Sequence, residues 1–402
     1  MNVTIQPGRA VGYVTVPSSK SMAHRMLICA GLSGGTSQIG GIDLNEDILA
    51  TIACLRALGA DCSVSGDTVT VRGVDMKSAK AMDILACHES GSTLRFFIPL
   101  ALLSGNKVSF SGTEKLLSRP LSIYAQLCAQ RGFTFTQNVS YVDVQGKLTA
   151  DTYTVPGDIS SQFISGLLLA LPMVEGDSVI SIIPPVESRG YIDLTLQAMA
   201  SFGVHAHWQD EVTLVIPGNQ QYTAADLYVE GDYSGAAFFE ALNFFGGDVD
   251  VGGLNPDSLQ GDKVYTEHFQ KLSFGCPTID ISNCPDLGPI LFAVAAAKHG
   301  AHFTGTRRLK LKESDRAAVM AEELSAFGAE VTVGENTVDI TAKAFHAPDR
   351  VLHGHNDHRI VMSLAVLLTR TGGSIEGAEA VSKSFPDFFD KLKDVDIDVT
   401  TK

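Results

Sequence analysis

The hydrophobic positions of the chain fall into two patterns, short runs that are apolar throughout and longer segments with one apolar face. A helix that is apolar on every side is buried, so the runs predict six buried helices, at residues 26–32, 94–103, 163–171, 236–245, 290–297 and 360–368. Segments such as 47–58 and 316–327 have one polar face and predict outer, amphipathic helices. Alternating stretches such as 67–72 and 211–216 predict strands of sheets with one covered face.

The predicted elements recur at a nearly constant spacing. A glycine followed by a short alternating stretch occurs at positions 35, 105, 176, 247, 300 and 373, which are 70, 71, 71, 53 and 73 residues apart. A helical end that closes on glycine recurs in the same phase, at positions 59, 132, 203, 275 and 328. Two sequence features that recur with the same spacing predict a repeated unit of supersecondary structure. The unit consists of an apolar helix, a strand, an amphipathic helix and a pair of strands.

Six such units in 402 residues divide most simply into three and three. The predicted fold class is α/β, with two domains that each pack three βαβαββ-type repeats around buried parallel helices. We expect an N-terminal domain at residues 19–230 and a C-terminal domain at residues 1–18 plus 231–402. The segment 4–16 would pair with the C-terminal half, so the chain would cross between the domains twice.

Hydroxyl, glycine and cationic side chains stand where the six buried helices are expected to begin. Serine, aspartate and glycine are ordinary caps, but Arg25, Arg95 and Arg359 fall in or near first turns, where the helix dipole repels a cation. A bound anion would remove that repulsion. Parallel helices would bring these starts together, so we expect an anion site in a cleft between the domains. For a single start, such as residues 20–25, solvated cations and simple caps are the alternative.

The composition limits the partners. A net charge of −15 argues against a nucleic acid or an anionic membrane surface. The seven cysteines are odd in number, form no Cys-x-x-Cys pair and lie mostly in apolar stretches, which is typical of buried thiols in a reducing compartment. The N-terminal residues 1–10 contain no apolar core of signal-peptide length, and the longest apolar runs, such as 290–297, are too short to span a membrane. We therefore expect a soluble, cytoplasmic protein.

Further cations follow the predicted strands, at Arg119, Arg307, Arg308, Lys310, Lys312, Arg316 and Lys383. They are more than one phosphate group requires, so we expect two anionic substrates. Two carboxylates stand among these cations. Neighbouring cations would keep Asp286 ionised and able to take a hydroxyl proton, and Glu313 could supply or take a proton. The alternative is structural, with Asp286 as a helix cap and Glu313 as a first-turn acid.

Four motifs occur in a fixed order along the chain: Lys20-Ser21 with Arg25, the run Leu-Lys-Glu-Ser-Asp-Arg at 311–316, Asn-Asp-His-Arg at 356–359, and Lys-Ser-Phe-Pro at 383–386. With them, residues 17–386 resemble the 5-enolpyruvylshikimate-3-phosphate synthase (3-phosphoshikimate 1-carboxyvinyltransferase) family of enolpyruvyl transferases. The resemblance implies two inside-out α/β domains with the active site in the cleft between them. It also implies transfer of the enolpyruvyl group of phosphoenolpyruvate to the 5-hydroxyl of shikimate 3-phosphate, through a tetrahedral intermediate, in aromatic amino acid biosynthesis.

Residue roles follow from the resemblance by position. Shikimate 3-phosphate would be bound by Lys20, Ser21, Arg25, Ser160, Ser161, Gln162, Ser188, Tyr191, Asp286, Arg308 and Lys312. Phosphoenolpyruvate would be bound by Lys20, Gly91, Arg119, Gln162, Arg316, Arg359 and Lys383. The catalytic residues would be Asp286 as base and Glu313 as acid, assisted by Lys20, His358 and Lys383. We expect no metal and no other cofactor, and a monomer whose partners are these two small substrates.

The sequence departs from the family pattern at two site positions, because Glu89 and Arg308 stand where the family usually has asparagine. Two other functions remain open. A related transferase acts on UDP-N-acetylglucosamine, but it carries a reactive cysteine in the loop before Arg119, and residues 111–118 contain none. A non-catalytic relative that only binds anions would not require both Asp286 and Glu313. A metal site at His353, His355 and His358 lacks a matched acidic or cysteine partner in the sequence.

Overall fold

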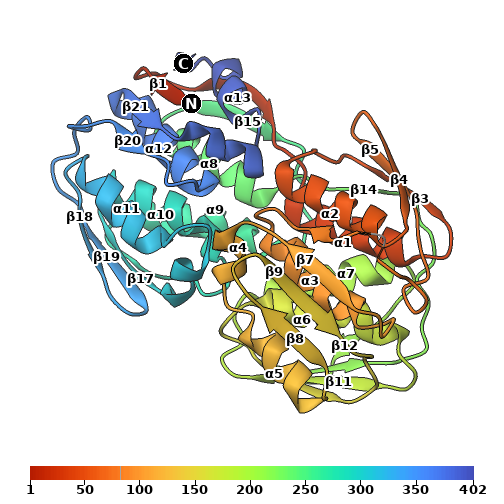
Figure 1. Ribbon diagram of the computed structural model, residues 1–402. Coiled ribbons are helices and arrows are strands. Elements are labelled where there is room, and N and C mark those ends of the chain that lie inside the picture. The colour runs from red at the N-terminus through yellow and green to blue at the C-terminus, as the bar shows by residue number, and fades with distance from the viewer. Residues whose placement is uncertain (82) are drawn as a thin grey trace. The chain divides into compact units, whose positions relative to one another are not determined.

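The computed structural model describes residues 1–81 and 83–402 (Figure 1). The chain forms two compact units, which we call the N-terminal unit (Ser18–Glu230) and the C-terminal unit (Met1–Pro17 with Gly231–Lys402). Each unit has its own hydrophobic core. In the part of the chain described, no helix has both the length and the apolar character needed to cross a membrane.

The N-terminal unit is built around three buried helices, α1 (Lys20–Leu32), α3 (Gly91–Ala101) and α6 (Ser161–Ala170). They lie on the segments whose uniform apolar character predicted burial. Each begins at a serine whose hydroxyl accepts a backbone N–H of the first turn: Ser19, Ser90 and Ser160. The other helices of this unit are α2 (Glu46–Ala57), α4 (Glu114–Ser118), α5 (Ser122–Gln130), α7 (Arg189–Ser201) and the short 3₁₀ helix Leu171–Met173.

Three four-stranded sheets cover these helices, and all follow one pattern. In each, the first two strands are parallel, and the remaining pairs are antiparallel. The first sheet contains β14 (Leu227–Tyr228), β3 (Thr36–Gly40), β5 (Thr68–Arg72) and β4 (Asp61–Ser65). The second contains β6 (Leu85–Ala86), β7 (Val108–Ser111), β9 (Tyr141–Gln145) and β8 (Thr134–Gln137). The third contains β10 (Thr152–Pro156), β11 (Ser178–Ile183), β13 (Thr213–Ile216) and β12 (His207–Trp208).

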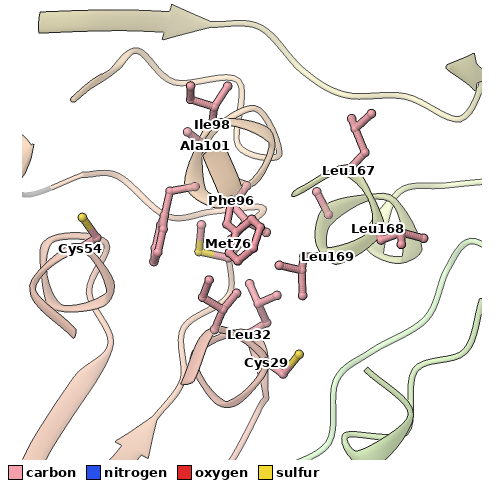
Figure 2. Close-up of a cluster of buried hydrophobic side chains, with 14 of the residues drawn as sticks. Cys29, Leu32, Cys54, Met76, Phe96, Ile98, Ala101, Leu167, Leu168 and Leu169 are labelled. Atoms are coloured by element: carbon pink, nitrogen blue, oxygen red, sulfur yellow. The ribbon is translucent and has the colours of Figure 1, made fainter. Parts of the chain in front are cut away.

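The core of the N-terminal unit lies where the three buried helices meet (Figure 2). Figure 2 shows Phe96, Met76, Leu169 and Leu32 converging from different segments, and all four are buried. A fully buried side chain of this size contributes about 1.5–3 kcal/mol through removal of apolar surface from water. This packing fixes the helices, and with them the polar side chains at their starts.

The C-terminal unit repeats the plan around α8 (Tyr233–Phe244), α10 (Gly288–Ala296) and α12 (His358–Thr371), again on the expected segments. Its other helices are α9 (Tyr265–Ser273), α11 (Arg316–Ser325), α13 (Phe388–Asp394) and four 3₁₀ helices, Gly261–Val264, Pro285–Leu287, Arg307–Leu311 and Ala378–Lys383. One sheet contains β16 (Thr278–Asp280), β17 (Ala301–Thr304), β19 (Thr337–Thr341) and β18 (Glu330–Val333). Another contains β20 (Leu352–His353), β21 (Gly373–Glu376), β1 (Asn2–Ile5) and β22 (Val399–Thr401).

The first residues of the chain complete the C-terminal unit. Strand β1 pairs antiparallel with both β21 and β22, and β2 (Val11–Thr15) pairs parallel with β15 (Asp248–Gly252). The N-terminal unit is closed in the same way from its far end, because β14 pairs with β3.

Two expectations need correction. The sheet of the fourth repeat has two strands, β15 and β2, because α9 is followed directly by β16, so this repeat lacks the strand pair expected of every unit. The cysteines were all expected to be buried, but Cys276 is exposed in the turn between α9 and β16, whereas the other six are buried.

Candidate active site

The starts of α3 and α6 are joined by polar side chains in the N-terminal unit. The Gln162 side chain donates from Nε2 to Ser92 Oγ at 2.9 Å, and its Oε1 accepts from Arg95 Nη1 at 2.6 Å. The guanidinium of Arg95 also stacks over the ring of Phe163, 5.3 Å from its centroid. Gln162 is therefore held in place by both helices.

Two guanidinium groups approach the first residue of α3. A Cβ atom placed on Gly91 would lie 3.0 Å from Arg95 Nη1 and 3.1 Å from Arg119 Nη1. These contacts are tighter than those of most real Cβ atoms, so a side chain at position 91 would push the two guanidinium groups outward by a few tenths of an ångström. The helix dipole adds a partial positive charge of about half a unit at the same point. Gly91, Arg95 and Arg119 thus surround a place suited to an anion.

The start of α1 carries Lys20 and Ser21, and Arg25 lies one turn further on. The Lys20 Nζ bonds Asp47 Oδ2 of α2 at 2.8 Å. Arg25 is buried and donates to four oxygens: Ser21 O at 2.6 Å, Thr195 Oγ1 at 2.8 Å, Tyr191 O at 2.9 Å and Ser165 Oγ at 3.4 Å. Burial lowers the pKa of Arg25 to about 10. Arg25 therefore connects α1 to α7 while remaining a cation at neutral pH.

The remaining predicted residues of this unit lie at the starts of α6 and α7. Ser160 caps α6 by accepting from the backbone N–H of Gln162 at 3.3 Å, and Ser161 is buried. Ser188 is buried immediately before α7 with φ of 57°, a left-handed conformation, and Tyr191 is half-buried in the first turn of α7. The predicted residues of the N-terminal unit thus gather at helix starts.

In the C-terminal unit, Asp286 lies among three cations. Its carboxylate is 2.8 Å from Arg316 Nη1, 3.0 Å from Lys312 Nζ and 3.2 Å from Arg359 Nη2. Burial by itself raises the pKa of Asp286, but Arg359, Lys312 and Arg316 outweigh burial and hold that pKa well below its usual range. Asp286 is therefore ionised at physiological pH.

Arg316 connects Asp286 to the second predicted catalytic carboxylate. It is 1% exposed, and its guanidinium also bonds Glu313 Oε2 at 2.6 Å and Asp357 Oδ2 at 2.9 Å. Burial opposes the charge of Arg316, but Asp357, Glu313 and Asp286 raise its pKa above the usual value. Asp286 and Glu313 are thus neighbours through one arginine.

Asp357 is a site residue whose contacts the sequence did not reveal. It begins α12 by accepting from the backbone N–H of Arg359 at 3.0 Å, and it also accepts from Ser314 Oγ at 2.9 Å. It belongs to the Asn-Asp-His-Arg motif at 356–359, but its place before an apolar helix indicates only a cap. The structure shows that this cap also binds the buried Arg316.

The other predicted residues of the C-terminal unit lie around this group. His358 is buried at the first position of α12, and Lys383 Nζ donates to Asn356 O at 2.8 Å. Arg308 is buried and donates from Nη2 to Ser282 O. Burial lowers the pKa of Lys312, against the opposing effect of Asp286.

A further buried carboxylate, Asp262, was missed. It accepts a hydrogen bond from Ser234 Oγ at the start of α8. Burial and the charge of Asp286 raise the pKa of Asp262 to about 6. No motif marked it, because it lies in a short 3₁₀ segment without apolar periodicity.

One group in the C-terminal unit has ligand atoms of the kind that bind metals. Glu322, Glu323 and His355 each place one such atom within 4.8 Å of the others. The Glu323 carboxylate already pairs with Arg350 Nη1 at 2.9 Å and with His355 Nε2 at 2.8 Å. These contacts fix the loop before α12 as an ion-pair cluster.

Glu89, one of the two departures from the family pattern, is half-buried just before α3.

Comparison with known proteins gives one consistent result. The EPSP synthase (3-phosphoshikimate 1-carboxyvinyltransferase) family matches residues 5–392. The 3-phosphoshikimate 1-carboxyvinyltransferase of Clostridium kluyveri is 36% identical over 416 residues, covering 97% of this chain and 96% of the relative. That of Clostridium beijerinckii is 38% identical over 422 residues, covering 98% and 97%. The structure of EPSP synthase from Acinetobacter baumannii superposes with a TM-score of 0.80 over 100% of both chains at 24% identity, which confirms the α/β fold.

Proposed function

Because the chain belongs to the EPSP synthase (3-phosphoshikimate 1-carboxyvinyltransferase) family, we propose that it transfers the enolpyruvyl group of phosphoenolpyruvate to the 5-hydroxyl of shikimate 3-phosphate. Phosphate is released, and the reaction serves the synthesis of aromatic amino acids. The single observation in the molecule that best supports this activity is the ionised Asp286, held between Arg316, Lys312 and Arg359.

The reaction needs a proton on carbon and a proton taken from oxygen. Glu313 donates a proton to the methylene carbon of phosphoenolpyruvate, which gives the neighbouring carbon cationic character. The 5-hydroxyl oxygen bonds to that carbon, and Asp286 takes its proton. A carboxylate with a lowered pKa is a weak base, but a hydroxyl oxygen bonding to a cationic carbon becomes strongly acidic, so a weak base suffices.

The tetrahedral adduct then loses phosphate. The bond between carbon and the phosphate oxygen breaks, and the methyl group formed in the first step gives one proton back to the Glu313 carboxylate, so that its C–H electron pair restores the carbon–carbon double bond. Cations near the departing phosphate stabilise its charge, and preorganised donors of this kind are usually the largest single contribution to catalysis. We assign this role to the cations Lys20 and Lys383, with His358 as a further hydrogen-bond donor.

The anion-binding residues have assigned substrates. Phosphoenolpyruvate is bound by Lys20, Gly91, Arg119, Gln162, Arg316, Arg359 and Lys383. Shikimate 3-phosphate is bound by Lys20, Ser21, Arg25, Ser160, Ser161, Gln162, Ser188, Tyr191, Asp286, Arg308 and Lys312. The position of two guanidinium groups about 3 Å from a Cβ on Gly91 supports the first assignment. Hydroxyl groups at helix starts, which can donate to phosphate oxygens, support the second.

Phosphate release tests the proposal. The protein should release phosphate from phosphoenolpyruvate in the presence of shikimate 3-phosphate and release none with UDP-N-acetylglucosamine. Asp286→Asn and Glu313→Gln should each lower kcat by about 10²–10⁴, the usual contribution of a general base or acid. Asp315→Asn is the matched control, because Asp315 is an exposed carboxylate that caps α11 beside these residues, and its variant should keep kcat.

Two outcomes would point elsewhere. Release with UDP-N-acetylglucosamine in place of shikimate 3-phosphate would identify the related transferase. Binding of both substrates by calorimetry without any phosphate release would identify a non-catalytic relative. The monomeric state and the cytoplasmic location stay predictions, and sedimentation and cell fractionation test them.

A further inference from the structure

Four buried polar side chains form a continuous hydrogen-bonded chain through the N-terminal unit. His24 Nδ1 lies 2.7 Å from Thr51 Oγ1, which lies 2.8 Å from Thr93 Oγ1, which in turn donates to Ser90 Oγ at 2.7 Å. All four are at most 1% exposed. This hydrogen-bonded chain joins α1, α2 and α3. Buried polar groups are costly unless each is satisfied, so such a chain has a structural or functional reason.

Along these four hydrogen-bonded side chains, donors and acceptors can be arranged in only one way. The Thr93 hydroxyl donates to Ser90, so toward Thr51 it must accept. The Thr51 hydroxyl then gives its single hydrogen to Thr93 and must accept from His24 Nδ1. His24 therefore carries a proton on Nδ1.

The imidazole of His24 is neutral. Burial, Lys20 and Arg25 all lower its pKa well below the usual value. Its second nitrogen, Nε2, is buried and has no hydrogen-bond partner within the described ranges 1–81 and 83–402. The only bond that positions the ring in that part of the chain is thus the one to Thr51.

The far end of this hydrogen-bonded series, at Ser90, is the start of α3. Ser90 Oγ accepts from both the hydroxyl and the backbone N–H of Thr93, the latter at 3.2 Å, and so caps the helix. The next residue is Gly91, whose Cβ position lies 3.0 Å from Arg95 Nη1 and 3.1 Å from Arg119 Nη1. A shift of Ser90 would therefore move Gly91, the first residue of α3, relative to the guanidinium groups of Arg95 and Arg119.

The near end of the chain is one helical turn from Lys20. Residues four apart lie on the same face of a helix, so Lys20 and His24 are neighbours on α1, and Asp47 and Thr51 are neighbours on α2. Helices α1 and α2 are therefore connected twice, one helical turn apart: by the ion pair between Lys20 and Asp47 at 2.8 Å, and by the hydrogen bond between His24 and Thr51. The hydrogen bond from Thr51 to Thr93 extends the second connection to α3.

We propose that His24 is a positioning residue for phosphoenolpyruvate, which acts through Thr51 and Thr93 to hold Ser90 and the start of α3 at a fixed distance from Lys20. The inference rests on the proposed function, in which Lys20 and Gly91 bind that substrate. His24 touches no reacting atom and transfers no proton. It sets the separation of two anion-binding groups that lie on different helices.

Thr51 offers the sharpest test, because two variants differ by one group each. Thr51→Val keeps the shape and removes the hydroxyl, so the chain is cut, whereas Thr51→Ser keeps the hydroxyl and loses a methyl group. We expect Thr51→Val to raise the KM for phosphoenolpyruvate about tenfold, equivalent to one lost hydrogen bond. The KM for shikimate 3-phosphate should change by less than about twofold, and Thr51→Ser should stay near the wild-type protein in both.

His24 supplies a second, independent pair of variants. In His24→Asn the amide nitrogen takes the place of Nδ1 and can still donate to Thr51, whereas His24→Leu cannot. His24→Leu should reproduce the effect of Thr51→Val on the KM for phosphoenolpyruvate, and His24→Asn should be milder. The double variant with His24→Leu and Thr51→Val should be no worse than either single one, because both cut the same chain.

Equal KM values for phosphoenolpyruvate in Thr51→Val and Thr51→Ser would overturn the inference, and so would equal increases in the KM of both substrates. If a variant fails to fold, the His24 pair decides the question in the same way. If the wild-type protein releases no phosphate, the proposed function has failed instead. The variants are then compared by the Kd of phosphoenolpyruvate measured by calorimetry.

Discussion

Asp286, which is half-buried, and Asp357, which is buried, are carboxylates that stay ionised because arginines and a lysine lie within hydrogen-bond distance. Arg316 is shared between them, and with Glu313 it forms a group of three carboxylates on one guanidinium. Removing one partner from a buried charge pair leaves the other without compensation, which costs about 3–5 kcal/mol. The same contacts that keep Asp286 ready to accept a proton therefore also stabilise the C-terminal unit.

A pH-dependent loss of stability follows for Asp357. Burial opposes its charge, but Arg316 and His358 lower its pKa below the unfolded value of about 3.9. Its contribution to stability is fully present above the unfolded pKa and is lost as the pH falls through the folded pKa. Asp357→Asn should therefore lower the free energy of unfolding by about 3 kcal/mol at pH 7 and by less at pH 3, which is already below the unfolded pKa.

Urea unfolding at the two pH values measures this difference. Asp315→Asn is the control, because Asp315 also caps a helix but is exposed and makes no contact with Arg316 that the structure records. A penalty for Asp357→Asn that is the same at pH 3 and pH 7 would show that its charge does not stabilise the fold.

Sequence reasoning at the residue scale identified which cations stand near helix starts but not their partners. Arg25 bonds Thr195, which is 170 positions away, and the chain from His24 to Ser90 crosses three helices. Such contacts depend on how helices from different repeats pack, and no local pattern encodes them. The ligand roles of these residues stay predictions.

At the scale of elements, the six buried helices were predictable because a run that is apolar on every side, as in α10, predicts a buried helix. The missing strand pair of the fourth repeat was not predicted. Its sequence signal is the spacing of 53 residues between Gly247 and Gly300, where the other spacings are at least 70. A shorter spacing shows that something is absent, but the pattern alone does not say which element.

Strand pairing at the chain ends predicts which fragments fold. Residues 18–230 contain their whole core and the closing pair of β14 with β3, so this fragment should unfold cooperatively in urea. Residues 231–402 lack β1 and β2, which leaves β15, β21 and β22 without partners that they have in the intact chain. This second fragment should not fold alone.

A circular permutation provides the control. The backbone N–H of Asn2 donates to Lys402 O at 2.9 Å, and the Lys402 N–H donates to Asn2 O at 2.8 Å, so a short linker can join the two ends. Residues 231–402 followed by such a linker and residues 1–17 should regain cooperative unfolding. The pairing argument would be wrong if 231–402 alone were as stable as this permuted fragment.

At the scale of the whole molecule, a chain with a net charge of −15 concentrates cations where two anionic substrates are proposed to bind. The acidic surplus elsewhere does not cancel them, because charges separated by more than about 10 Å of salt solution are largely screened. Arg316, Arg359 and Lys312 are instead compensated locally by Asp286, Glu313 and Asp357. Local balance of this kind lets the cations and the proposed catalytic carboxylates coexist.

In the proposed mechanism, a proton from the protein is added to the methylene carbon of phosphoenolpyruvate before phosphate leaves. Running the reaction in D₂O and examining the product by mass spectrometry and proton NMR tests it directly. Glu313 then carries a deuteron, the intermediate gains a methyl group with that deuteron, and elimination removes one of its three hydrogens. The account predicts deuterium in the methylene group of the enolpyruvyl product, whereas product formed at full rate with an undeuterated methylene group would contradict it.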